Sequence, residues 1–151
     1  MQFIKAFSLT LLITIGTITA WPQKQYASLN HVAIYVYNLQ KSTVFYKDIM
    51  ALEPIAEPFH DGKHSWFKVG AHAQLHVIEG AHTIMPHDKN SHLCFSVPSM
   101  PTFISRLTKA GIAYEDWPGK ANSITTRPDG VQQIYFKDPD GYWIEVNNDQ
   151  Y

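Results

Sequence analysis

Residues 29–36 read LNHVAIYV and residues 90–97 read NSHLCFSV, so the chain carries one pattern twice. In each copy a histidine near the start is followed by alternating side chains, which is typical of a half-buried β-strand. A repeat of this length indicates that each copy begins one supersecondary unit. The sequence therefore predicts two similar halves that stabilise each other.

The same order of elements follows each copy of the pattern. The spacing of apolar residues predicts helices over 39–52 and 100–110, the second one ended by Gly111 as its C-terminal cap. Residues 66–76 and 135–145 then align without a gap, and each stretch holds a turn between two strands. Each half thus contains a strand, a helix and at least two further strands.

The remaining strands have weaker patterns. We expect them at 54–59 and 112–116, and we expect a mobile loop beside the site at 117–130, which is rich in Pro, Gly and Asn. The predicted fold is α+β, with two paired βαβββ modules at about 28–80 and 90–148 that form a curved sheet around a central cleft.

Composition excludes several classes of protein. The 151 residues include 12 Lys and Arg against 13 Asp and Glu, a formal net charge of -1. This balance argues against binding to nucleic acid or to an anionic membrane surface, so a small molecule is the expected partner. A single cysteine, Cys94, excludes an intrachain disulfide and a multi-cysteine zinc site.

The N-terminus has the pattern of a signal peptide. Lys5 precedes an apolar stretch over 6–15, and small residues follow up to Ala20. We predict a signal peptide at 1–20 and an exported protein, periplasmic or secreted, with no stable membrane insertion after cleavage. An uncleaved N-terminal anchor is the alternative.

Four side chains at matched positions point to a metal site. Alternation along the strands separates apolar faces, which should pack on the helices, from faces that carry histidine. Equivalent positions of a repeat meet around a pseudo-twofold axis, which would bring together His31, His76, His92 and Glu145. Three imidazoles and one carboxylate suit a divalent zinc, nickel, manganese or iron ion. The other histidines fall in loops or turns, where a surface role is expected.

The motifs at 29–34, 92–97 and 138–145 (DPDGYWIE) are similar to those of the vicinal oxygen chelate superfamily. That superfamily includes glyoxalase I, methylmalonyl-CoA epimerase, extradiol dioxygenases and fosfomycin-resistance enzymes. The resemblance covers about residues 28–148, and its most specific part is the Asp-Pro-Asp-Gly turn that leads to Glu145.

The resemblance also assigns roles to residues. It implies that His31, His92 and Glu145 take the family's metal positions. It places His76 where glyoxalase I-like members carry a glutamate and epimerase-like members a glutamine, and this chain departs from both. It places Tyr135 where fosfomycin-modifying members have a tyrosine that contacts substrate. It further favours a homodimer.

A metal that holds two neighbouring substrate oxygens stabilises negative charge that develops on them. For an isomerase or lyase we expect Glu145 to act both as ligand and as proton-transferring base. Trp66 and Tyr135 are predicted to form walls of the pocket, although ordinary core positions are equally compatible with their pattern. Arg127 and Gln133 could bind an anionic or polar end of the substrate.

Three functions remain open from sequence. The first is a metal-dependent, glyoxalase I-like lyase or isomerase acting on a small α-hydroxycarbonyl compound or its thiol adduct. The second is an extradiol-type dioxygenase, against which a fourth protein ligand would count, because oxygen needs an open position. The third is a non-catalytic protein that binds a metal or a small ligand. The site could form within one chain, or between two chains that exchange halves.

Overall fold

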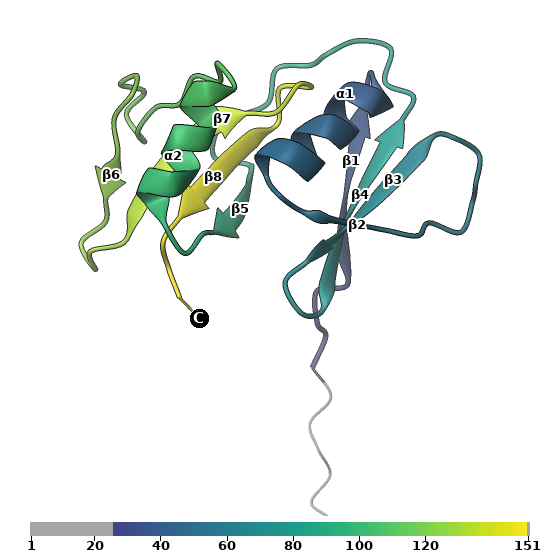
Figure 1. Cartoon of the computed structure of the whole chain (residues 1–151), viewed down its shortest axis with the longest axis horizontal. Coiled ribbons are helices and arrows are strands. Elements are labelled where there is room, and N and C mark those ends of the chain that lie inside the picture. Colours follow the sequence, from purple (N-terminus) through teal and green to yellow (C-terminus); the bar gives the residue numbers. More distant parts are fainter. Residues whose placement is uncertain (1–25, 151) are drawn as a thin grey trace, which may run out of the picture.

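The computed structural model describes residues 26–150, so the predicted signal peptide at 1–20 lies outside the described residues. Two four-stranded sheets form the molecule and lie side by side in Figure 1. The first has the order β1 (His31–Val36), β4 (Ala73–Glu79), β3 (His64–Val69) and β2 (Glu53–Ile55). The second has the order β5 (His92–Ser96), β8 (Trp143–Asn147), β7 (Gln132–Lys137) and β6 (Thr125–Thr126).

Each module places one helix after its first strand. In the first module α1 (Leu39–Val44) continues into a π-helical turn, η1 (Phe45–Ile49), and in the second module α2 spans Met100–Lys109. The side chains of Asn38 and Ser99 cap the two N-termini, since each accepts a hydrogen bond from a backbone N–H of the first turn. In residues 26–150 we find no helix with the length and apolar character that a membrane span requires.

Several local expectations differ from the structure: the strand expected at 54–59 is shorter, Glu53–Ile55, and the loop expected at 117–130 contains the short strand Thr125–Thr126. The predicted helix over 39–52 ends earlier, because the π-helical turn widens its last part before the chain bends at Ala51, whose φ is 55°. Residues 112–116 form no regular strand, since only Glu115 makes isolated bridges, to Ala121 and Tyr135. The helix ending at Gly111 is as expected: this residue has a φ of 69°, which glycine adopts without steric cost.

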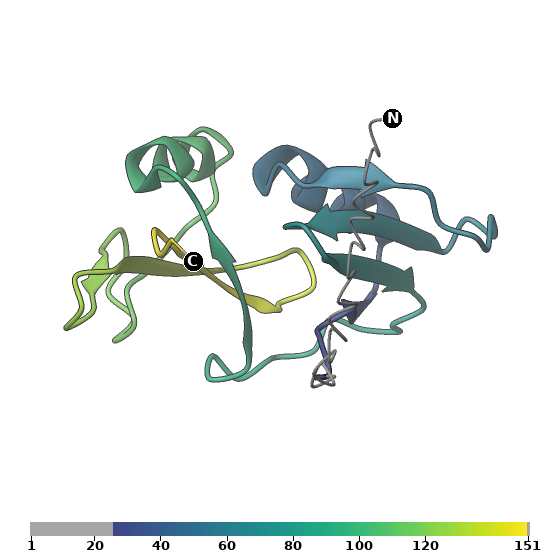
Figure 2. The same ribbon diagram turned by 90° about the horizontal axis from the view of Figure 1, so that it is seen from below.

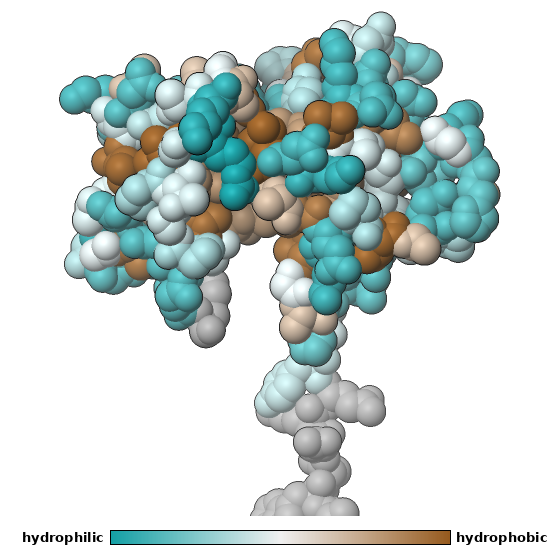
Figure 3. Space-filling model, in the orientation of Figure 1, coloured by the Kyte–Doolittle hydropathy of each residue, from teal (hydrophilic) through white to brown (hydrophobic). Residues whose placement is uncertain are grey.

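A shared apolar core joins the two modules. Both helices lie on the same side of the sheets, as Figure 2 shows. Phe136 contacts Phe45 of the first module and Phe103 of the second, with ring centroids 6.3 and 5.8 Å apart. The helix-bearing side is mainly hydrophilic outside this core, with hydrophobic side chains visible between the helices (Figure 3).

The Asp-Pro-Asp-Gly turn binds the second module to the first. Asp140 accepts hydrogen bonds of 2.6 Å from the Ser42 hydroxyl and from the backbone N–H of Tyr37. Asp138 accepts one of 2.7 Å from the Tyr46 hydroxyl. Both carboxylates are buried, so the turn fixes the position of the second module against α1 and η1.

On each sheet, the face turned away from the helices carries the polar side chains that were predicted to bind metal. In the first sheet His76 pairs in register with Trp66, and in the second Glu145 pairs with Tyr135. Because these pairs occupy equivalent strands, the gapless alignment of the two halves is matched by the register of the strands. The apolar partners on the same strands, such as Leu75 and Ile144, point into the core.

Candidate metal centre

One half of the candidate centre lies on the second module. His92 begins β5 and Glu145 lies in the middle of β8, with His92 Nε2 3.2 Å from Glu145 Oε2. The other ring nitrogen of His92, Nδ1, lies 2.8 Å from the carbonyl oxygen of Lys89 and donates to it, which fixes the ring with Nε2 toward Glu145. Ligand atoms lie about 2.0 to 2.2 Å from a divalent ion, so two neighbouring ligands are about 3 Å apart. The spacing of this pair therefore fits two ligands of one ion.

Hydrogen bonds hold Glu145 as a carboxylate. Its Oε2 accepts from the Tyr135 hydroxyl at 2.7 Å, and its Oε1 accepts from Asn147 Nδ2 at 3.0 Å and from Cys94 Sγ at 3.4 Å. Gln133 Nε2 in turn donates to the Tyr135 oxygen at 2.5 Å. Burial alone would raise the pKa of Glu145, but the hydrogen bonds outweigh it and the pKa is lowered. The carboxylate is therefore charged and oriented before anything binds.

The donors around Glu145 stay protonated at neutral pH. Burial, then the hydrogen bond to Glu145, raises the pKa of Tyr135 well above its ordinary value. Burial and the charge of Glu145 raise the pKa of the Cys94 thiol to about 12. Both groups consequently act as neutral hydrogen-bond donors.

The other half of the candidate centre lies on the first module, where three rings form a stack. His76 lies between Trp66, with ring centroids 3.8 Å apart, and His31, with centroids 4.2 Å apart, and all three rings are nearly parallel. A metal lies close to the plane of each imidazole that binds it, so one ion cannot bind His31 and His76 while they stack face to face. His31 Nδ1 contacts Asn30 and His76 Nε2 contacts Gln74, each at 2.8 Å.

The stack also affects the charge of His76. Burial is the largest cause that lowers the pKa of His76, and the neighbouring His31 lowers it further. His76 is therefore neutral at neutral pH, which suits either coordination or stacking. His31 is exposed and is the freer of the two imidazoles to bind a ligand.

The four predicted ligands thus form two pairs, one on each sheet. Across residues 26–150 of a single chain, no three His, Cys, Asp or Glu side chains lie close enough together to hold a metal ion. The pair from one module fits half of a coordination sphere, and the chemistry of its donors suits zinc, nickel, manganese or iron. A complete set of ligands requires the open faces of two modules to meet.

The predicted substrate-binding residues lie in different environments. Trp66 belongs to the stack, and Tyr135 and Gln133 belong to the network around Glu145. Arg127 lies at the surface, where it pairs with Asp129 and, at 3.6 Å, with Asp149. Two of these side chains therefore adjoin Glu145, and Arg127 is already engaged by other carboxylates.

Two further residues of the centre were not predicted. Asn147 shares a strand face with Glu145, so alternation could have identified it. Lys89 could not be identified from sequence, because its partners come from a distant loop. Its Nζ donates to Glu115 Oε1 at 2.7 Å and to the carbonyl oxygens of Asp116 and Trp117 at 2.7 and 3.0 Å.

Comparison with known proteins places the chain in a family. The family profile described as Glyoxalase/Bleomycin resistance protein/Dioxygenase superfamily matches residues 28–146. Glyoxylase I 4 of Arabidopsis thaliana is 27% identical over an alignment of 129 residues that covers 80% of this chain and 70% of that protein. Metallothiol transferase FosB of Shouchella clausii is 27% identical over an alignment of 122 residues that covers 79% of this chain and 78% of that protein.

Solved structures agree with this placement. The structure of oxidase ChaP-H1 superposes with a TM-score of 0.68 and 25% identity, over 83% of this chain and 98% of that one. The matched profile spans both modules and includes His31, His76, His92 and Glu145. The chain therefore belongs to the Glyoxalase/Bleomycin resistance protein/Dioxygenase superfamily.

Proposed function

We propose that this protein is a metal-dependent, glyoxalase I-like lyase or isomerase that acts on a small α-hydroxycarbonyl compound or its thiol adduct. The observation that carries the proposal is the His92–Glu145 pair, in which an imidazole nitrogen and an oriented carboxylate lie 3.2 Å apart. The names of two relatives, a glyoxylase I and a metallothiol transferase, support the same proposal.

His31, His76, His92 and Glu145 would hold the divalent ion, and the stacked rings of His31 and His76 would have to separate to reach it. When bound, such an ion supplies Lewis-acid stabilisation of negative charge on substrate oxygens, which is worth several kcal/mol. Tyr135 and Asn147 each donate a hydrogen bond to one oxygen of Glu145. These bonds hold the carboxylate in place, which favours a role as a permanent metal ligand. The additional role of Glu145 as the proton-transferring base stays a prediction.

A homodimer would complete this centre. The first module would supply His31 and His76 from one subunit, and the second module would supply His92 and Glu145 from the other. The separation of the two pairs within one chain supports this arrangement. On each module, the sheet face turned away from the helix carries polar and aromatic side chains. Such side chains suit a cleft formed where the two faces meet.

Metal content and turnover test the proposal. The purified protein should bind about one zinc, nickel, manganese or iron ion per chain, and Glu145→Gln should lower the affinity at least about tenfold. Lys68→Met, a change at an exposed position of the first sheet, is the control. Turnover of α-hydroxycarbonyl compounds, with or without a thiol, is expected. Metal-free protein after reconstitution, or ligand binding without turnover, would contradict the proposal.

Ring-cleaving oxygenation is a second candidate, and the ring stack favours it. If His76 stays stacked between Trp66 and His31, the remaining donors are two imidazoles and one carboxylate. That set, with open positions, is typical of non-haem iron oxygenases. The name of the structural neighbour ChaP-H1, an oxidase, is in line with redox chemistry.

Substitution of His76 separates the two candidates. With three ligands, His76→Gln changes iron affinity by less than about threefold, whereas His31→Ala lowers it at least about tenfold. Consumption of oxygen with a catechol would establish the oxygenase. Equal losses of affinity in both variants would show four ligands and remove the support for oxygenation.

We further propose that the protein is exported, on the strength of the pattern in residues 1–20. N-terminal sequencing of the protein from the extracellular or periplasmic fraction should begin near Trp21. Recovery of the intact N-terminus in the cytoplasm would contradict export.

A further inference from the structure

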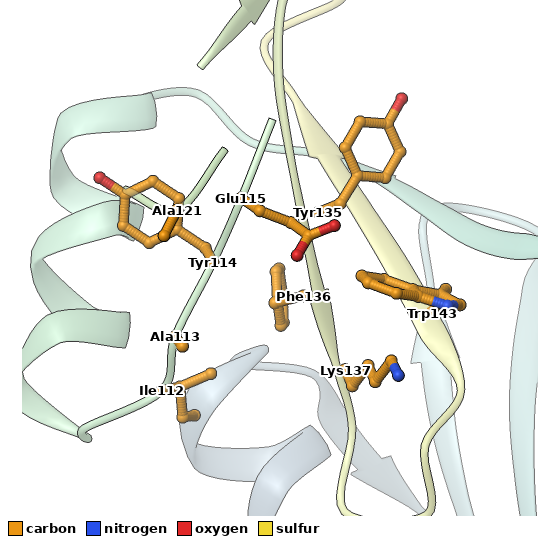
Figure 4. Close-up of a pocket in the computed structure, with 9 residues that line it drawn as sticks. All are labelled: Ile112, Ala113, Tyr114, Glu115, Ala121, Tyr135, Phe136, Lys137 and Trp143. Atoms are coloured by element: carbon orange, nitrogen blue, oxygen red, sulfur yellow. The ribbon is translucent and has the colours of Figure 1, made fainter. Parts of the chain in front are cut away.

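A cavity opens beside the candidate metal centre on the second module. It is a cleft of about 490 Å³ between the segment that follows α2 and strands β7 and β8. Its walls include Tyr114, Phe136 and Trp143, with Glu115 and Lys137 as the charged side chains (Figure 4). This volume lies in the range of small-molecule sites, which are mostly apolar with a few polar groups.

The cleft adjoins the centre through two side chains. The ring of Tyr135 lines the cleft, while its hydroxyl points away from it (Figure 4) and donates to Glu145. Trp143 lines the cleft and pairs in register with His92. A molecule bound at the centre could therefore extend into the cleft.

The uncompensated charge of the cleft is positive. Glu115 is neutralised by Lys89, whose Nζ lies 2.7 Å away. Lys137 Nζ lies 4.6 Å from the Trp143 ring centroid, and within residues 26–150 it forms no ion pair with a carboxylate. An anionic group would gain a partner at Lys137, whereas a cationic group would meet an ammonium.

We propose that this cleft is a subsite for an aromatic carboxylate. The ligand's ring would lie along Trp143, and its carboxylate would pair with Lys137. The proposal rests on the proposed function, because it assigns the distal part of the substrate of the same centre. It adds that the substrate has an aromatic or conjugated body with a negative charge remote from its chelating oxygens.

Two probes of equal shape test the charge preference. 2-Naphthoate and its neutral amide are titrated against the full-length protein in EDTA, while the indole N–H signals of the four tryptophans are followed by NMR. The acid should bind about fivefold more tightly than the amide, as expected for a partly exposed ion pair. The Trp143 signal, assigned with Trp143→Phe, should shift most.

Substitutions at Lys137 provide the decisive comparison. Lys137→Met should abolish the preference for the acid, and Lys137→Arg should retain it. The matched control is Lys68→Met, because Lys68 occupies the equivalent position in the first sheet and pairs with Glu53 at 3.8 Å. Folding of each variant is checked by its NMR spectrum.

Three results would overturn the subsite. These are equal binding of acid and amide, a preference that survives in Lys137→Met, or a preference that appears only without EDTA. The last result would show that the carboxylate binds the metal. It would support the proposed function and overturn the assignment of the cleft as a subsite. A protein that binds no metal but keeps the Lys137-dependent preference would contradict the metal proposal alone.

Discussion

At the scale of single residues, Glu145 shows how a buried charge is prepared for a cation. Both of its oxygens accept hydrogen bonds, and the donors come from three strands, β5, β7 and β8. Fixed donors that orient a ligand raise metal affinity, because the ligand does not have to reorganise when the ion arrives. The Tyr135–Gln133 contact extends this support by one more side chain.

Removal of the Tyr135 hydroxyl tests this support. Tyr135→Phe should weaken metal binding by about 10- to 100-fold, because Glu145 Oε2 loses its shortest hydrogen bond. Calorimetric titration with zinc measures the effect. Tyr114→Phe is the control, since Tyr114 lines the neighbouring cleft rather than the Glu145 network. Equal affinities of Tyr135→Phe and the wild type would show that the hydroxyl has no positioning role.

The raised pKa of Cys94 predicts slow alkylation. The thiolate is the reactive form, so a pKa of about 12 keeps the thiol unreactive at pH 8 even though the residue is exposed. Iodoacetamide should modify Cys94 at least about tenfold more slowly than free cysteine, and the rate should rise only as the pH approaches about 12.

Neutralising Glu145 should accelerate the same reaction. Glu145→Gln removes a negative charge that contributes to the raised pKa of Cys94. Mass spectrometry of the alkylated protein over a range of pH gives both rates. Rapid labelling of the wild type at pH 8 would show that Glu145 and burial do not hold the proton on the thiol.

At the scale of elements, the turn between β7 and β8 acts as the clamp between modules. Asp140 is 4% exposed and Ser42 is fully buried, so their hydrogen bond is shielded from water. The turn requires its two aspartates because their carboxylates accept hydrogen bonds from α1 and η1. It requires glycine at position 141 because the backbone φ there is 86°. A Cβ at Gly141 would also lie 3.0 Å from the carbonyl oxygen of Met85.

Breaking this clamp should destabilise the protein. Asp140→Ala leaves the Ser42 hydroxyl and the Tyr37 N–H without an acceptor, which should lower the free energy of unfolding by about 2 to 4 kcal/mol. Urea denaturation measures the loss, and Ser42→Ala should give a smaller one. Glu53→Ala, at an exposed ion pair, should change stability by less than about 0.5 kcal/mol. Similar values for Asp140→Ala and Glu53→Ala would refute the clamp.

At the scale of the whole molecule, the polar faces of the two modules bring no three candidate ligands together within residues 26–150. The apolar core is fully formed within one chain, because the helices and the turn join the two modules. The open faces keep one pair of candidate ligands each. Under the proposed function, a second copy of the chain would supply the missing pair by symmetry.

Mixed dimers test where the site forms. His31→Ala and Glu145→Ala chains should each bind no metal alone. If the site spans two subunits, co-expression restores about a quarter of the wild-type sites, because half of the randomly formed dimers carry one intact site. Bound metal per chain and turnover are the measurements. No recovery in a preparation shown to contain mixed dimers would place all ligands within one chain.

Much of this fold could be predicted from the chain itself. The repeated pattern predicted two βαβββ modules, and the gapless match of 66–76 with 135–145 predicted that His76 and Glu145 are equivalent. Local rules suffice here, because side chains alternate along every strand and a turn sets the register of its hairpin. The prediction of a regular strand over 112–116 was wrong. Whether that segment pairs depends on the strand beside it rather than on its own side-chain pattern.

Long-range packing decided the rest. The stacking of His76 on Trp66 and His31, and the contact of Lys89 with Glu115, depend on how distant segments meet. The sequence by itself determined which side chains share a face of each sheet. Only the tertiary structure decided that these side chains form two separate pairs, because the orientation of one module against the other is set by the buried clamp and core.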